Sequence, residues 1–342
     1  MASFMIFLTI ILVSILLIGI VAVIFRYTRE IKAARRRLDS LGSSVIQTTC
    51  GPIEYASIGE GYPVLVVHGA LGGFDQGLFL AQHIDIPNCQ IISVSRFGFL
   101  RSPVPPGATL DTQADAYAAL LDALEIRRAA VFAVSAGSTS AIRFAARHPD
   151  RVSALILLGP DAPGEKSMAL PPRFLANILF GNDFVYWAMI HVLGKKMQIA
   201  TGLVPKGYVL TPEYAALVNK VQIGSLPVSR RMGGWDFETY TCEKEFRESV
   251  TPASSYPLSK IETPVLVIMA EDDPISLPAN VRALAEQMPN ARLYAVPDGG
   301  HFLFGHAKEA NAEIAQFLHR YMVEPEKAAD GNFYPLNAED NR

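Results

Sequence analysis

Cysteine and charge are both scarce in this chain of 342 residues. The three cysteines, Cys50, Cys89 and Cys242, lie far apart without the spacing of metal ligands, which argues against a disulfide framework and against a bound metal. Charged residues make up 18% of the chain and the net charge is −3, so no basic surface indicates nucleic-acid binding. We therefore expect an apolar-rich protein with no metal, no cofactor and no nucleic-acid partner.

Charge is absent altogether from Phe4 to Phe25, which also contains no proline. At about 1.5 Å per residue, a helix of this length covers the roughly 30 Å hydrocarbon core of a bilayer. A cleaved signal peptide would need a preceding basic residue, a shorter apolar run and a small-residue cleavage site. Here no Lys or Arg precedes the run, and Ile-Phe-Arg-Tyr follows it. Residues 1–28 are therefore predicted to form an uncleaved anchor in the lipid bilayer.

A basic segment follows the anchor. Because positively charged flanks stay on the cytoplasmic side, the chain after the anchor is expected in the cytoplasm. The basic residues are Arg26, Arg29, Lys32, Arg35, Arg36 and Arg37. Residues 29–44 are polar and predict a helical connector.

The rest of the chain alternates apolar runs with helical patterns. Residues 44–58 predict an antiparallel hairpin. Continuous apolar runs, typical of buried parallel strands, follow at 64–67, 90–94, 129–134, 154–158, 265–269 and 292–296. Helical patterns stand at 112–124, 136–147, 279–287 and 307–321. The predicted fold is α/β, with a doubly wound, mostly parallel sheet.

One interval breaks this alternation. About a hundred residues between Leu158 and Val265 contain no convincing strand, which is too long for a structureless loop in a compact domain. Helical patterns at 173–180, 184–197 and 212–223 predict an inserted helical cap over 161–261. The α/β core then comprises 45–160 and 262–323, and a polar tail occupies 324–342.

A serine stands at the junction of a predicted strand and a helix. Ser135 follows the apolar run 129–134 and is surrounded by small residues, Ala133, Ala136 and Gly137. This is a variant of the G-x-S-x-G elbow, in which a strained turn exposes the serine hydroxyl, with Ala133 replacing the first glycine. An ordinary β-α turn of a parallel sheet could have the same sequence, so the motif needs partners elsewhere.

Such partners follow other predicted strands. The first parallel strand leads into His68-Gly69-Ala70-Leu71-Gly72-Gly73, a loop of small residues able to present backbone N–H groups. Ala270-Glu271-Asp272-Asp273-Pro274 and Pro297-Asp298-Gly299-Gly300-His301 follow the last two strands. Ligands of such sheets sit beyond the carboxyl ends of the strands, so a serine, an acid and a histidine would meet there.

From about Gly51 to Tyr321 the chain resembles the α/β-hydrolase superfamily, nearest to membrane-anchored monoacylglycerol lipase-like enzymes and lid-bearing bacterial esterases. The resemblance rests on the His68–Gly73 loop, the elbow, the acid turn and Gly300-His301. It implies that Ser135 is the nucleophile, His301 the general base and acid, and Asp273 the residue that orients the imidazole. The backbone N–H groups of Ala70 and Ala136 would form the oxyanion hole.

Several assignments stay open. Asp273 is favoured over Asp272 and Glu271 because it fits the family spacing from Ala270 to Pro278, and Asp161 is a further alternative for the acid. Leu71, Trp187 and Phe302 are expected to contact substrate, although the simplest interpretation of Trp187 is a residue of the cap's own core.

The predicted function is that of a membrane-anchored serine hydrolase cleaving a carboxylic ester of a lipophilic acyl compound, such as a monoacylglycerol. On the same fold the alternatives are an amidase or aminopeptidase, an epoxide hydrolase and a C–C hydrolase. An aminopeptidase would need cap acids for the substrate ammonium, and Glu238, Glu243 and Glu245 could serve. A non-catalytic, membrane-tethered lipid-binding or scaffold protein is the alternative of another class.

Overall fold

A computed structural model describes residues 2–84, 88–164, 171–249 and 257–322, and a single eight-stranded sheet forms the centre of the molecule. The strand order is β1-β2-β4-β3-β5-β6-β7-β8. A hairpin of β1 (Ser44–Thr48) and β2 (Gly51–Ile58) pairs antiparallel with β4 (Cys89–Val94). The remaining strands are parallel: β3 (Tyr62–Val67), β5 (Ala129–Val134), β6 (Val152–Leu158), β7 (Val265–Ala270) and β8 (Ala291–Val296).

Helices cover both faces of this sheet, as predicted for a doubly wound fold. Because side chains alternate along a strand, Leu65 and Val67 point into one core and Val64 and Val66 into the other. The first core is closed by α3 (Leu110–Ala123), α4 (Gly137–Arg147) and α11 (Pro278–Glu286). The second is closed by α2 (Phe74–Ile84) and α12 (Ala307–Tyr321).

The helix α2 was not predicted from the sequence. Its interior contains Gly77, a residue that lowers helix propensity by roughly 1 kcal/mol relative to alanine. A Cβ atom at this position would lie 2.1 Å from Oγ of Ser93 on β4. The glycine therefore permits α2 to approach the sheet closely, a requirement that local propensity does not reveal.

The interval between β6 and β7 is helical, in agreement with the predicted cap. It contains α5 (Arg173–Gly181), α6 (Asp183–Val192), α7 (Lys195–Ala200), α8 (Pro212–Gly224), α9 (Met232–Phe237) and α10 (Glu243–Ser249). The helix predicted over 184–197 is two helices, because Gly194 adopts φ +45° between α6 and α7. Residues 165–170 and 250–256 of the predicted cap, and the whole of the predicted tail, lie outside the described residues.

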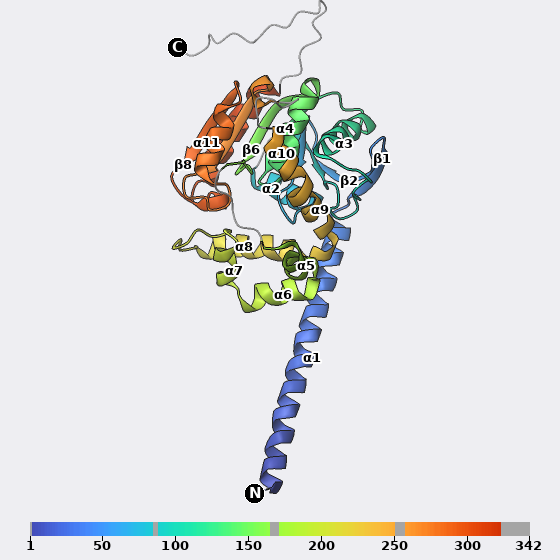
Figure 1. Ribbon diagram of the computed structural model, residues 1–342, viewed down its shortest axis with the longest axis vertical. Helices are drawn as coiled ribbons and strands as arrows, with labels where there is room; N and C mark the ends of the chain where they lie inside the picture. The colour runs from blue at the N-terminus through green and yellow to red at the C-terminus, as the bar shows by residue number, and fades with distance from the viewer. Residues whose placement is uncertain (1, 85–87, 165–170, 250–256, 323–342) are drawn as a thin grey trace, which may run out of the picture.

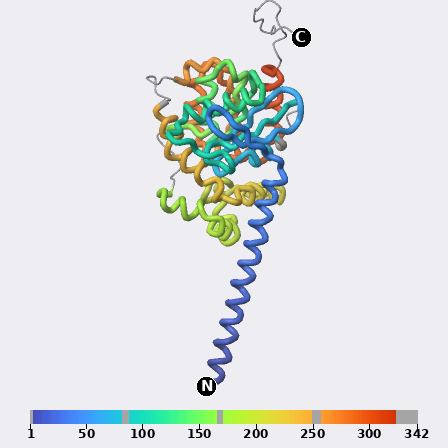
Figure 2. The backbone as a smooth tube through the Cα atoms, turned by 90° about the vertical axis from the view of Figure 1, so that its right-hand side faces the viewer, coloured from blue at the N-terminus to red at the C-terminus, as the bar shows by residue number. Residues whose placement is uncertain are grey.

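The predicted anchor and connector form one continuous helix, α1 (Ala2–Ser40), which projects from the body of the protein (Figures 1 and 2). Residues 3–26 are exposed, whereas Ile31 and Ala34 pack among cap residues and Leu38 packs against the core beside α2. Figure 1 shows the helices α5 to α8 beside α1, between its exposed half and the sheet. The helix is long and apolar enough to span a membrane.

Candidate active site

Ser135 occupies the sharp turn that the elbow motif predicted. It adopts φ +52° between the end of β5 and the start of α4, a conformation that is strained for a residue with a side chain. Gly137 allows the tight turn: a Cβ there would lie 2.4 Å from the carbonyl oxygen of His68. Ala133 is completely buried in the core, so its methyl group is accommodated where the usual motif has glycine.

Asp273 and His301 are in direct contact at the ends of β7 and β8. His301 Nδ1 lies 2.8 Å from Asp273 Oδ2, and the two side chains are 8% and 1% exposed. The other carboxylate oxygen, Asp273 Oδ1, accepts hydrogen bonds from the backbone N–H groups of Ile275 (2.8 Å) and Ser276 (3.0 Å). The carboxylate is therefore held by the turn and directed at the imidazole.

The competing carboxylates have other contacts. Asp272 Oδ1 accepts a hydrogen bond from the backbone N–H of Gly300 at 2.8 Å, so it supports the histidine turn rather than the imidazole. Glu271 is paired with Arg282 at the surface. Asp161 donates its backbone N–H to the carbonyl oxygen of Ser135 at 3.3 Å, which places it beside the elbow. The geometry thus favours Asp273 as the partner of His301.

The end of β6 joins the elbow to the histidine. The backbone N–H of Ser135 donates to the carbonyl oxygen of Leu158 at 3.0 Å. The next residue, Gly159, touches the imidazole: a Cβ on it would lie 3.0 Å from His301 Cε1. Among the described residues the Ser135 hydroxyl has no hydrogen-bond partner, so its contact with His301 is not made in this conformation. Such contacts commonly tighten only when substrate is bound.

Electrostatics tune the two ionisable groups of this region. Burial alone would lower the pKa of His301, but the charge and hydrogen bond of Asp273 outweigh it and raise that pKa above 6.5. Burial, with the nearby Glu243 carboxylate, raises the pKa of Asp161 to about 6. The negative charge of Asp161 also raises the pKa of His301. A histidine whose pKa is raised by a neighbouring carboxylate is a stronger base, which suits the removal of a proton from a hydroxyl group.

The predicted oxyanion groups lie on two loops next to Ser135. A Cβ on Gly69 would lie 3.2 Å from Ser135 Cβ, so the loop after β3 packs directly on the elbow. Gly69 donates its own N–H to Gln76 Oε1 at 2.9 Å. Within the described residues the N–H groups of Ala70 and Ala136 have no acceptor in the protein. Both are therefore available to a negatively charged oxygen.

His68 stabilises the loop that it begins. It is fully buried, donates from Nδ1 to the carbonyl oxygen of Gly69 at 2.8 Å and accepts at Nε2 from the backbone N–H of Arg96 at 3.1 Å. Burial and the charge of Arg96 lower its pKa well below 6.5. His68 is thus a neutral structural residue.

The structure also reveals a buried ionic network that was not predicted from the sequence. Asp75, in the first turn of α2, binds Arg231 through both carboxylate oxygens at 2.9 and 2.8 Å, and Arg37 of α1 at 3.2 Å. Arg231 Nη1 also donates to the carbonyl oxygen of Gly72 at 2.5 Å. The network therefore connects α1, the cap and the loop that contains Ala70. Its members are far apart in sequence, and only the acid in a first helical turn is a local signal.

The three predicted substrate residues have different surroundings. Leu71 adopts φ +51° in the loop after β3 and is partly buried. Phe302 stacks on Phe304 and lies edge-on to His301, with ring centroids 6.2 Å apart, so it is close to the site. Trp187 is buried against α1 and donates from Nε1 to Glu30 at 2.8 Å. This contact favours a structural role, and substrate contact by Trp187 stays a prediction.

A doubly wound sheet with a helical insertion after β6, and with a serine elbow and a histidine–carboxylate pair at the carboxyl ends of its strands, is the architecture of an α/β hydrolase. The chain belongs to the alpha/beta hydrolase fold family, whose model matches residues 62–192 and 222–307. The resemblance inferred from the sequence is confirmed at this level, and the protein is a hydrolase of this family.

Curated relatives of this chain include hydrolases with different substrates. A poly(3-hydroxyalkanoate) depolymerase of Ectopseudomonas oleovorans is 28% identical over 218 residues, 63% of this chain and 70% of the relative. A 2-hydroxy-6-oxononadienedioate/2-hydroxy-6-oxononatrienedioate hydrolase of Burkholderia vietnamiensis is 26% identical over 277 residues, 78% of this chain and 91% of the relative. An uncharacterized hydrolase of Bacillus subtilis is 36% identical over 107 residues, but the match spans only 37% of that relative.

Solved structures agree with the fold. An alpha/beta hydrolase fold protein from Nakamurella multipartita is 28% identical, with a TM-score of 0.63 over 81% of this chain and 99% of that chain.

Proposed function

We propose that the protein is a membrane-anchored serine hydrolase that cleaves a carboxylic ester through an acyl-enzyme on Ser135. One observation carries the proposal: a strained serine at a strand end lies beside a buried His301–Asp273 pair, in a chain of the α/β hydrolase family. The ester-cleaving depolymerase among its relatives supports this choice of bond.

The proposed roles follow from the contacts. His301 takes the proton of the Ser135 hydroxyl as that oxygen attacks the ester carbonyl, and later gives the proton to the leaving alcohol. Asp273 holds the proton on Nδ1, so that Nε2 is free to act as the base. The N–H groups of Ala70 and Ala136 stabilise the oxyanion, each contributing about 3 kcal/mol to the barrier reduction. Water then hydrolyses the acyl-enzyme by the same proton relay.

The proposed substrate is lipophilic, of the monoacylglycerol type. Two observations support it: the exposed apolar half of α1, and the cap, which packs on the same helix through Trp187 and its neighbours. An anchor in the bilayer would place the cap near the membrane surface, where acyl esters partition. The positive flank of the anchor supports a cytoplasmic location of the hydrolase domain. Arg37 is occupied by the buried network, so the exposed Arg29, Lys32, Arg35 and Arg36 provide that flank.

Labelling with a fluorophosphonate tests the nucleophile. The wild type is expected to react covalently, and Ser135→Ala is expected not to react. Ser153→Ala is the matched control, because its buried hydroxyl on β6 has no partner among the described residues and its loss leaves the site intact. Equal labelling of Ser135→Ala would rule out the assignment.

Turnover of an ester series tests the substrate class. The kcat/KM of glycerol monoesters is expected to rise from two-carbon to long acyl chains, and to rise further when the protein is in lipid nanodiscs. A preference for short soluble esters that is unaffected by lipid would remove the lipophilic substrate and leave the hydrolase assignment intact.

A C–C hydrolase is the second candidate, favoured by the Burkholderia vietnamiensis relative, which covers most of this chain. If this candidate holds, the kcat/KM for 2-hydroxy-6-oxononadienedioate, the compound in the name of that relative, should be at least equal to the kcat/KM for esters.

The aminopeptidase alternative is weakened by the partners of its proposed acids. Glu238 is buried in an ion pair with Arg96 and accepts from Thr139 Oγ1 at 2.6 Å, and Glu243 pairs with Arg247. Glu245 accepts the backbone N–H of Leu110 at 2.6 Å. A non-catalytic lipid-binding protein would show lipid binding with no turnover dependent on Ser135.

A further inference from the structure

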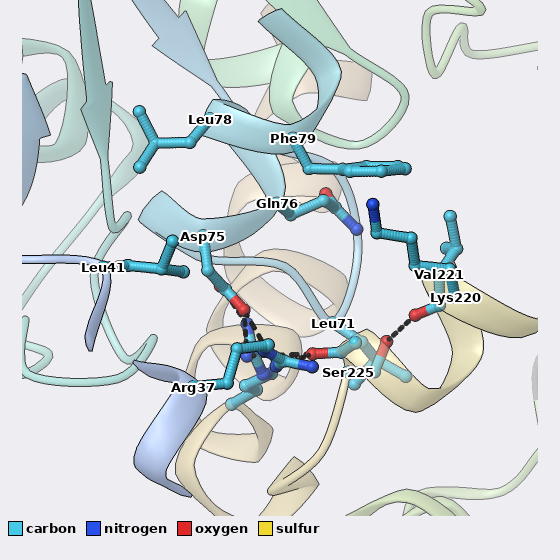
Figure 3. Close-up of a pocket in the computed structure, with 12 residues that line it drawn as sticks. Arg37, Leu41, Leu71, Asp75, Gln76, Leu78, Phe79, Lys220, Val221 and Ser225 are labelled. Atoms are coloured by element: carbon cyan, nitrogen blue, oxygen red, sulfur yellow. Dashed lines mark hydrogen bonds and ion pairs between the residues drawn. The ribbon is translucent and has the colours of Figure 1, made fainter. Parts of the chain in front are cut away.

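A cavity of about 190 Å³ lies where α1, α2 and the cap helix α8 meet (Figure 3). None of Ser135, Asp273 and His301 lines it. Its apolar wall consists of Leu41, Leu71, Leu78, Phe79 and Val221, and its polar lining includes Arg37, Asp75, Gln76, Lys220 and Arg231.

The lining carries more positive than negative charge. Three cations, Arg37, Arg231 and Lys220, face one carboxylate, Asp75, which both arginines already share. An anion entering the cavity would therefore meet an excess of positive charge beside apolar surface.

Several hydrogen-bond donors of these cations are uncommitted in the described part of the chain. Arg37 bonds only through Nη2, which leaves Nε and Nη1. The Nε of Arg231 is buried without a partner, an arrangement that is unfavourable unless an acceptor arrives. Lys220 Nζ lies 4.5 Å from the Phe79 ring centroid and forms no ion pair with a described residue. Figure 3 shows the side chain reaching toward Phe79 and Gln76. Such donors prefer a carboxylate or phosphate oxygen.

The position of the cavity along α1 determines which kind of anion can reach it. Arg37 follows Phe25 by twelve residues, or about 18 Å of helix. The headgroup layer beyond the hydrocarbon core is only roughly 5–8 Å thick on each side. With α1 spanning the bilayer, a lipid that stays in the membrane does not reach Arg37, whereas an amphiphile small enough to leave it does.

We propose that this cavity binds the carboxylate of a fatty acid, with the anion on Arg37 and Lys220 and the first part of the chain on Leu71, Phe79 and Val221. The inference rests on the proposed function in that such an acid is the product of cleaving an acyl ester. A cavity of this size holds the carboxylate and a few methylene groups, and the rest of the chain extends through its open side.

Binding of an anion in this cavity would affect the conformation of the predicted oxyanion loop. Gln76 accepts the N–H of Gly69, and Arg231 donates to the carbonyl oxygen of Gly72, so two residues of the cavity wall hold both ends of that loop. An anion that draws Arg37 or Arg231 from Asp75 would shift the loop. The site therefore makes the released acid a regulator of turnover that does not compete directly with substrate.

Direct binding to the full-length Ser135→Ala protein in phosphatidylcholine nanodiscs tests the site without turnover. Octanoate is titrated calorimetrically, with empty discs as the blank, and is compared with octanol and inorganic phosphate. We expect saturable octanoate binding, at least about tenfold weaker binding of octanol, and no binding of phosphate alone. Equal affinity for octanol, or tight binding of phosphate alone, would overturn the fatty-acid assignment.

Variants locate the binding. Lys220→Gln removes an exposed cation and is expected to weaken octanoate binding about tenfold, and Val221→Phe fills the cavity and is expected to abolish it. Lys196→Gln, an exposed lysine of α7 outside the cavity, is the matched control and should bind normally. Unchanged binding in both cavity variants would refute the site.

The proposed function and this site fail separately. In the wild type, octanoate is expected to lower ester turnover in a pattern that is not competitive, and Lys220→Gln should relieve this inhibition. If Ser135-dependent labelling is absent while octanoate still binds the cavity, the hydrolase assignment is wrong and the binding site stands. If turnover is normal and octanoate does not bind, the binding site is wrong and the hydrolase assignment stands.

Discussion

Replacing Asp273 by asparagine gives the sharpest test of the proposed proton relay. The carboxylate accepts three hydrogen bonds: two backbone N–H groups reach Oδ1 and His301 reaches Oδ2. An asparagine has one carbonyl oxygen and one NH₂ group. If its oxygen keeps the two backbone donors, its NH₂ faces Nδ1 of His301, which must then be unprotonated. The proton moves to Nε2, and the imidazole can no longer accept the proton of Ser135.

The expected loss is large because the wrong tautomer removes the base. Replacement of the acid by asparagine in a Ser-His-Asp triad lowers kcat about 10⁴-fold, and at 1.36 kcal/mol per tenfold this is about 5.4 kcal/mol of barrier. The assay is hydrolysis of a chromogenic ester by detergent-solubilised protein, with thermal melting to show that the variant is folded.

Two neighbouring carboxylates provide the controls. Asp272→Asn keeps an oxygen for the N–H of Gly300 and is expected to retain activity within about tenfold. Asp161→Asn leaves the His301–Asp273 pair in place and is also expected to remain active. If Asp161→Asn lost as much activity as Asp273→Asn, or if Asp273→Asn stayed active, the proposed relay would be refuted.

Other consequences of the structure can be measured independently. Because His301 must be neutral to act as a base and its pKa is raised, kcat/KM should fall as the pH drops through a value above 6.5. Asp75→Asn removes the carboxylate that neutralises buried Arg231, so the free energy of unfolding should fall by about 3–5 kcal/mol and the melting temperature by roughly 6 °C or more. Deleting residues 2–25 should release a folded protein from membranes, whereas deleting residues 2–40 should also lower its melting temperature, because the end of α1 packs on the cap and core.

For each of these predictions, a specific outcome would contradict the reasoning. Asp161→Asn should move the acidic limb of the pH profile downward, since the charge of Asp161 raises the pKa of His301; an upward shift would contradict this. Glu313→Gln breaks a half-exposed surface pair with Arg292 and should lower the free energy of unfolding by less than about 1 kcal/mol. A decrease equal to that of Asp75→Asn would refute the larger contribution of the buried network. Equal melting of the two truncated proteins would show that the end of α1 contributes no stability.

The sheet and its strand ends could be predicted because their signals are local. Buried parallel strands are continuous apolar runs, and each predicted run coincides with a strand to within one or two residues. The Ser135 turn was predictable for the same reason, since small residues must surround a strained elbow. The helix α2 and the break at Gly194 were not, because a glycine in a helical pattern has no single local meaning: Gly77 serves close packing and Gly194 separates two helices.

By itself the sequence determined which chemical groups follow which strands: a donor loop after β3, a serine after β5, an acid turn after β7 and a histidine after β8. The fold of the family brings these strand ends together. The family spacing favoured Asp273 over Asp272, but only the tertiary structure shows that Asp273 contacts the imidazole and Asp272 the N–H of Gly300, because these neighbours in sequence differ in where the turn directs them. The tertiary structure also decided that the end of α1 packs on the cap. Arg37 of α1 is linked through Asp75 and Arg231 to the predicted oxyanion loop. Contacts between residues so far apart depend on how the helices pack, and no local pattern encodes that packing.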